Sequence, residues 1–151
     1  MSIDYGLSIN LHCQKGVLSV IDIVKSLTKG GWSLFSEENK IIFTDVGDCD
    51  DFEYVSRSMS IETFYDIIDK KKANQEVIAF ALFLVEGSDK YRIDVMIFCD
   101  FTVLISPSDC SKKMLCSHVK ILDISWYLER TIPFLSNDIM VVEDFAFRQH
   151  Y

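Results

Sequence analysis

The chain has 151 residues, the size of one domain, and its content of 49% hydrophobic and 13% aromatic residues excludes a disordered tail. Its 23 acidic and 15 basic side chains give a formal net charge of −8. Phosphate backbones and anionic lipid surfaces repel such a protein, so we expect no nucleic-acid partner and no membrane partner. We expect one compact domain over residues 1–151, because nothing in the sequence resembles a flexible linker.

The first third of the chain alternates strand and helix signals. Hydrophobic residues alternate with polar or small ones over residues 5–13, which is the period of a half-buried strand. They recur at helical spacing over residues 17–27, and the two glycines at 30–31 are expected to end that helix. Residues 32–35 and 40–44 flank a polar turn, which predicts a hairpin.

The middle of the chain predicts a helix followed by an antiparallel meander. Ser60 is a suitable N-cap for a helix over about residues 61–72, which carries one hydrophobic stripe. Residues 76–85 are hydrophobic on both faces and indicate a central strand. Two further strands, over residues 91–99 and 101–106, complete the meander.

The last third predicts a short strand over residues 118–122 and a third helix capped by Asp123 or Ser125. Pro133 is expected to kink or shorten that helix, and residues 139–142 suit a last strand. The whole order of elements favours an α+β fold, in which about three helices pack on a mainly antiparallel sheet.

The negative charge is concentrated in the first half of the chain. Residues 1–69 hold 12 acidic and 5 basic side chains, and the helix predicted over 61–72 presents its acidic residues on one polar face. The pattern fits either a solvated surface or a surface that docks a basic partner. We expect a docking surface, with two aromatic residues as anchors. Its residues are Asp45, Asp48, Asp50, Asp51, Phe52, Glu53, Tyr54, Glu62, Asp66 and Asp69.

A metal site is the alternative use of the aspartates at 45–53, since hard cations prefer oxygen ligands. An EF-hand loop starting at Asp48 would have Phe52 at its fifth position and Glu53 at its sixth, and one starting at Asp45 would have Gly47 at its third. Neither register fits the calcium loop. We therefore expect no metal and no cofactor, with a small metal-dependent hydrolase kept as the alternative.

Catalytic chemistry has little support in the sequence. Cys110, Cys116 and His118 lie close enough in sequence to suggest a zinc or nucleophilic site, but buried cysteines more often serve as small hydrophobic residues. A Walker lysine motif, GxGxxG, GxSxG and HExxH are all absent from the sequence. We expect a protein that is not an enzyme and has no catalytic residues.

The expected compartment is the cytoplasm. The chain does not begin with a basic region followed by a hydrophobic stretch, as a secretory signal would. Its longest uncharged hydrophobic run, residues 77–85, is shorter than the about 20 residues of a membrane helix. The cysteines form no CxxC motif, and we expect them to be reduced thiols.

A small, acidic α+β domain with a carboxylate-rich loop and no catalytic motif resembles the immunity proteins of bacterial polymorphic toxins, those of contact-dependent growth inhibition in particular. The resemblance covers the whole chain through size, charge and the mixture of strands and helices, and it carries over no individual residue. It implies tight inhibition of one cognate toxin, often a basic nuclease, by blocking the toxin's active site or binding beside it. A self-associating structural subunit, paired through an exposed strand edge, is a further alternative.

Overall fold

The computed structural model describes residues 4–14, 16–48, 51–108, 111–116 and 119–150. The described elements in the first half are β1 (Asp4–Cys13), α1 (Val20–Lys29), β2 (Ile41–Thr44), β3 (Tyr54–Arg57), α2 (Ile61–Ala73) and β4 (Ile78–Glu86). Those in the second half are β5 (Asp89–Ile97), β6 (Thr102–Pro107), β7 (Met114–Cys116), β8 (Val119–Leu122), α3 (Ile124–Glu129), the 3-10 helix η1 (Ile132–Phe134) and β9 (Met140–His150).

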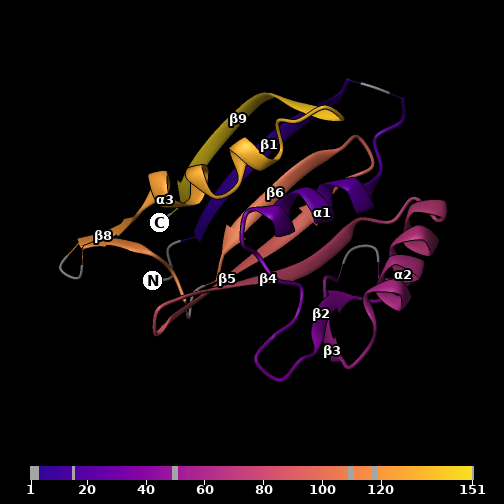
Figure 1. Ribbon diagram of the computed structural model, residues 1–151, viewed down its shortest axis with the longest axis horizontal. Helices are drawn as coiled ribbons and strands as arrows, with labels where there is room; N and C mark the ends of the chain where they lie inside the picture. Colours follow the sequence, from indigo (N-terminus) through magenta and orange to yellow (C-terminus); the bar gives the residue numbers. More distant parts are fainter. Residues whose placement is uncertain (1–3, 15, 49–50, 109–110, 117–118, 151) are drawn as a thin grey trace.

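A seven-stranded antiparallel sheet in the order β3-β2-β4-β5-β6-β1-β9 forms the centre of the fold (Figure 1). The predicted meander is confirmed as β4-β5-β6, in which Val95 of β5 faces Phe80 on one side and Ile105 on the other. β7 and β8 pair with each other in a separate two-stranded sheet. The α+β class and the mainly antiparallel sheet with three helices are therefore confirmed.

The helices bury one face of the sheet, because the strands turn alternate hydrophobic residues toward them. The ring of Phe64 in α2 lies edge-on to Phe43 and Phe80, at 5.8 and 5.9 Å between centroids. The indole of Trp126 in α3 lies 4.7 Å from the ring of Tyr91 in β5. Figure 1 shows α1 crossing the same face between α2 and α3. None of the helices in the described ranges is long and apolar enough to cross a membrane.

The first helix begins later than the hydrophobic spacing predicted. The side chain of Ser19 accepts a hydrogen bond from the backbone N–H of Asp22, so the helix starts at Val20. Val17 lies before this cap with 84% of its surface exposed. The second helix and its Ser60 cap agree with the prediction, and so does the shortening of the third, where Pro133 lies in η1.

The hairpin predicted from residues 32–35 and 40–44 was only partly right. Phe35 makes a single bridge to Ile41, whereas Ser33 bridges to Phe83 of β4. The full ladder partner of β2 is β3, which the sequence analysis missed. The last strand was also predicted too short, because β9 pairs with β1 along its whole length, from Met140 to His150.

The end of α1 packs closely against the chain that follows α3. A Cβ atom at Gly30 would lie 2.8 Å from the carbonyl oxygen of Arg130, which already accepts a hydrogen bond from the Trp32 indole. Gly30→Ala should therefore lower the free energy of unfolding by about 1–3 kcal/mol, measured by urea denaturation. Gly6→Ala is the control, because its Cβ would meet a Leu104 methyl group at an ordinary 3.4 Å. That variant should be as stable as the wild type, and equal losses for both would contradict the packing described.

Candidate functional site

The loop between β2 and β3 lies beside α2, and a buried lysine of that helix holds it there. Lys71 is 1% exposed, and its Nζ donates hydrogen bonds to the backbone oxygens of Thr44, Asp45 and Asp48 at 3.0, 2.8 and 3.2 Å. It also lies 3.0 Å from the Thr44 hydroxyl oxygen. A buried ammonium needs such partners to replace water, so the helix fixes the path of the loop.

The sequence contained a signal for Lys71 that the analysis missed. Phe64 and Ile68 are the buried residues of α2, and position 71 falls three residues further on the same stripe. A lysine at a position where the helical period predicts a hydrophobic residue is buried, so its ammonium needs oxygen acceptors. Here the acceptors lie in the loop between β2 and β3.

Two of the predicted docking carboxylates shape the loop itself. Asp45 forms an ion pair with Arg57 of β3 at 2.6 Å. The two carboxylate oxygens of Asp48 accept hydrogen bonds from the backbone N–H groups of Phe52, at 3.0 Å, and Glu53, at 2.7 Å. Phe52 takes a left-handed backbone conformation, with φ of 51°, inside this turn. These contacts give Asp45 and Asp48 structural roles, while Asp50 lies outside the described residues.

The remaining predicted carboxylates are exposed. We call them the acidic surface: Asp51, Glu53, Glu62, Asp66 and Asp69. No ion pair or side-chain hydrogen bond within the described ranges engages any of their carboxylates. The loop supplies the first two and α2 the other three, and Lys71 joins the loop to that helix. The loop and α2 lie at the same end of the sheet, beside the β3 edge (Figure 1).

The two predicted aromatic anchors differ in their surroundings. Phe52 is partly buried in the loop. Tyr54 faces Thr44 across the β2-β3 ladder, and its ring lies 5.7 Å from the guanidinium of Arg92 in β5. Burial, with a smaller contribution from the charge of Asp94, raises the pKa of Tyr54 to about 12. The phenol is therefore neutral at physiological pH, and it lies on the sheet face opposite to α2.

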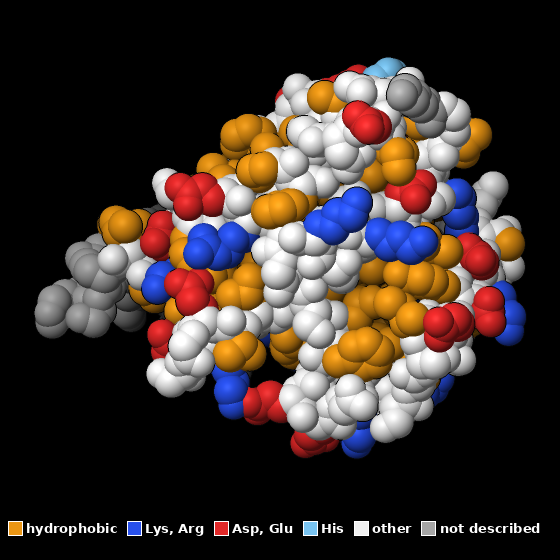
Figure 2. Space-filling model, in the orientation of Figure 1, with side chains coloured by type: hydrophobic (Ala, Val, Ile, Leu, Met, Phe, Trp, Pro, Cys, Tyr) orange, Lys and Arg blue, Asp and Glu red, His pale blue; other side chains and the backbone are white. Residues whose placement is uncertain are grey.

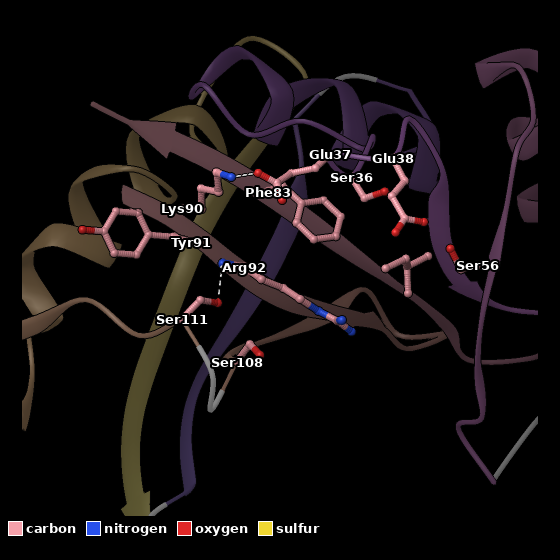
Figure 3. A pocket seen from close by; sticks show the side chains of 11 residues that line it. Ser36, Glu37, Glu38, Ser56, Phe83, Lys90, Tyr91, Arg92, Ser108 and Ser111 are labelled. Atoms are coloured by element: carbon pink, nitrogen blue, oxygen red, sulfur yellow. Dashed lines mark hydrogen bonds and ion pairs between the residues drawn. The ribbon is translucent and has the colours of Figure 1, made fainter. Parts of the chain in front are cut away.

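That opposite face carries a pocket of about 450 Å³, which the sequence analysis did not find (Figure 3). Its lining includes Phe83, Lys90, Arg92 and the hydroxyl groups of Ser56 and Ser108. The guanidinium of Arg92 lies 6.0 Å from the Phe83 ring and donates from Nε to Asp94 at 2.9 Å. The lining comes from five separate segments, so only the strand pairing brings it together.

Lys90 of this pocket forms an ion pair with Glu37, so its ammonium is already engaged. Glu38 pairs with Lys40 at 3.5 Å. The pocket is an open hollow lined by hydroxyl groups and paired charges, which suits weak polar contacts more than proton transfer.

The predicted alternatives in metal and thiol chemistry fall partly outside the structure. Cys110 and His118 lie outside the described residues, and nothing is described of the Cys116 side chain. Within the ranges that the structure describes, no group of three or more His, Cys, Asp or Glu side chains could hold a metal ion.

The role of Lys71 can be measured by removing its ammonium. Lys71→Met keeps a long apolar side chain but removes the Nζ donor from the backbone oxygens of Thr44, Asp45 and Asp48. The Asp45 oxygen keeps a hydrogen bond from the Asp48 backbone N–H at 3.2 Å, so the loss falls mainly on the other two oxygens. Because a buried unpaired acceptor costs roughly 1–3 kcal/mol, the free energy of unfolding should fall by at least that amount. The exposed neighbour Lys70 gives the matched control, Lys70→Met, which should be nearly neutral. Equal stability of the two variants would show that the loop does not depend on Lys71.

The ion pair of Asp45 predicts a pH dependence. Burial acts to raise the pKa of this carboxyl, but the hydrogen bonds from Arg57 and Val46 and the charges of Arg57 and Lys71 outweigh it, and the pKa lies below 3.8. A carboxyl whose pKa is lowered by folding stabilises the fold at pH values above its ordinary pKa. This stabilisation is lost as the pH falls through the lowered pKa.

Asp45→Asn should therefore reduce stability at neutral pH by the amount typical of an exposed ion pair, roughly 0.2–1 kcal/mol. The difference from the wild type should shrink in strong acid, which urea denaturation across the pH range can follow. Asp51→Asn is the control, and a constant difference for Asp45→Asn at every pH would contradict the assignment.

Comparison with known proteins adds no relative to these observations. No protein-family model, no curated protein and no solved structure matches this chain. Its function is therefore inferred from the acidic surface and its surroundings.

Proposed function

We propose that this protein is a non-enzymatic inhibitor that binds a basic toxin domain, such as a nuclease, through its acidic surface. This is the role that the resemblance to polymorphic-toxin immunity proteins implies. The observation that carries the proposal is a set of five exposed carboxylates, unpaired within the described chain, on a loop and a helix that Lys71 joins.

The ordering of the loop supports binding energetically. An interface formed by a flexible loop loses conformational entropy when it binds, and a loop already fixed by hydrogen bonds loses less. Here the Asp48 carboxylate and the Lys71 ammonium make those hydrogen bonds within the free protein. These hydrogen bonds hold residues 45–48 and the backbone N–H groups of Phe52 and Glu53 before any partner arrives.

The charge of the surface supports the choice of partner. A nuclease holds the phosphates of its substrate in a cleft lined by basic side chains. Carboxylates can occupy such a cleft in place of phosphates, and opposite potentials accelerate the encounter of the two proteins. The three carboxylates of α2 lie on exposed positions of one helix, so they can meet several basic groups of a partner at once.

The proposal predicts the effect of charge reversal. The triple variant Asp51→Lys, Glu53→Lys and Asp66→Lys should fail to capture a basic protein that the wild type captures from a lysate of the source organism at low salt. With the purified partner, the association rate should fall by about tenfold or more and lose most of its dependence on salt. Stopped-flow or surface plasmon resonance measures both quantities.

A matched control separates the surface from the net charge. The variant Asp89→Lys, Glu129→Lys and Asp138→Lys makes the same change of charge at exposed positions elsewhere. It should bind nearly as the wild type does. If both triple variants bind equally well, or if the captured protein is acidic, the proposed surface is wrong.

A further inference from the structure

The outermost strand β9 is an exposed edge of 11 residues at the opposite end of the sheet from the acidic surface (Figure 1). Its inner side pairs with β1, and the sheet order ends there. Phe145 on this strand is 49% exposed, although it is a large hydrophobic residue. A long edge that carries hydrophobic side chains is a template for adding another strand.

The regular part of this edge is bounded by a bulge. Asn10 of β1 faces Asp144, whereas Leu11 faces Val142, so Glu143 is an extra residue in β9. The Glu143 carboxylate lies 3.3 Å from the ring of His12 in its own chain. From Asp144 onward the ladder with β1 is regular, and this segment can accept a new strand without distortion.

Side chains in the regular segment point alternately to the two faces. Phe145 and Phe147 face Ile9 and Leu7 across the ladder, on the helix-covered side. Asp144, Ala146 and Arg148 lie on the other side.

The two charged residues of that side differ in their contacts. Asn10 donates to one oxygen of Asp144 at 2.5 Å, while the other oxygen has no partner among the described residues. The Arg148 guanidinium has no ion pair there either.

A second copy of the same strand fits this edge in one register. When two identical strands pair antiparallel about a two-fold axis, the axis passes between a residue and its own copy. An axis at Asp144 sets two carboxylates opposite each other, and an axis at Phe145 or Phe147 sets Arg148 opposite an uncharged residue. Of these four positions, only the axis at Ala146 pairs both charges of the regular segment, Asp144 and Arg148, with an opposite charge.

We propose that β9 pairs antiparallel with the β9 of a second copy, with Ala146 at the two-fold axis, so that the two sheets join into one. In this register Asp144 of one protomer faces Arg148 of its partner, and the pair occurs twice. Phe145 faces the partner's Phe147 on the helix-covered side, also twice. Cross-strand ion pairs and aromatic pairs of this kind each stabilise a sheet. The dimer extends beyond the proposed function, because it uses a different surface.

Sedimentation velocity of the full chain, from micromolar to near-millimolar concentration, tests the dimer. The wild type should shift from monomer to dimer as the concentration rises. Asp144→Arg and Arg148→Asp, each alone, set like charges opposite each other and should raise the concentration needed for dimers by about tenfold. An equimolar mixture of the two variants restores opposite charges at every position, so it should dimerise as the wild type does.

Cross-linking tests the register. Ala146→Cys sets the new thiol opposite its own copy, where the Cα atoms of facing residues lie about 4.5–5.5 Å apart, within the range of a disulfide. Diamide, which takes up the two electrons and two protons of the thiols, should convert this variant to a covalent dimer in high yield. Asp144→Cys leaves the two thiols on the order of 13 Å apart and should give no more dimer than the wild type.

Three outcomes would overturn the proposal. The first is a wild type that stays monomeric at every concentration, and the second is a mixture of variants that does not recover the dimer. The third is protection of the β9 amides from hydrogen exchange only when a different protein is bound, which assigns the edge to that protein. Asp66→Arg should dimerise normally but capture the basic partner less well, so failure of this dimer and failure of the acidic surface give different results.

Discussion

The buried ammonium of Lys71 is the constraint on which the acidic end of the molecule depends. A charge that is 1% exposed is stable only if protein oxygens replace its water, and three backbone oxygens with one hydroxyl do so here. These oxygens belong to residues 44–48, so the same interaction folds the loop and fastens it to α2. Residues 44–48, which begin a stretch of high negative charge, are therefore held against the helix.

Within that segment, carboxylates of the same chemistry take two roles. The carboxylate of Asp45 pairs with Arg57, and that of Asp48 accepts hydrogen bonds from backbone N–H groups, so both residues belong to the scaffold. The carboxylates of Asp51 and Glu53 contact no partner among the described residues and stay available to another molecule. Charge density along the sequence cannot separate these roles, because the difference lies in which oxygen finds a donor after folding.

The two proposed surfaces occupy opposite ends of the sheet. The acidic surface lies beside β3, and β9 forms the other edge, with five strands between them. A dimer joined through β9 would therefore leave an acidic surface exposed on each protomer. Figure 2 shows acidic and basic side chains interspersed over the helix-covered face of one protomer. In such a dimer the two acidic surfaces would lie at opposite ends of the joined sheet.

The sequence was most informative where one local period governs a whole element. The meander from β4 to β6 and the helix capped by Ser60 follow directly from hydrophobic spacing and one capping hydroxyl. β3 was missed because Ser56 and Arg57 break its alternation, and its pairing with β2 crosses the acidic loop.

The pocket and the cage around Lys71 arise only from tertiary contacts. The pocket combines residues as far apart in sequence as Ser36 and Ser111, which no local pattern joins. Lys71 was recognisable as a polar residue on a hydrophobic stripe, but its acceptors lie 23 to 27 residues away. The sequence identifies the run of carboxylates, but which of them are engaged within the fold follows only from tertiary contacts.

Hydrogen exchange of the complex with the captured basic partner, compared with the free protein, is the sharpest test of the acidic surface as the binding site. If that surface binds the partner, amides of the 51–53 segment and of the exposed side of α2 should gain protection on binding, while β9 and the sheet face that carries the pocket should not change. Protection confined to the face of the sheet that carries Arg92 and Ser108, with the acidic surface unchanged, would contradict it.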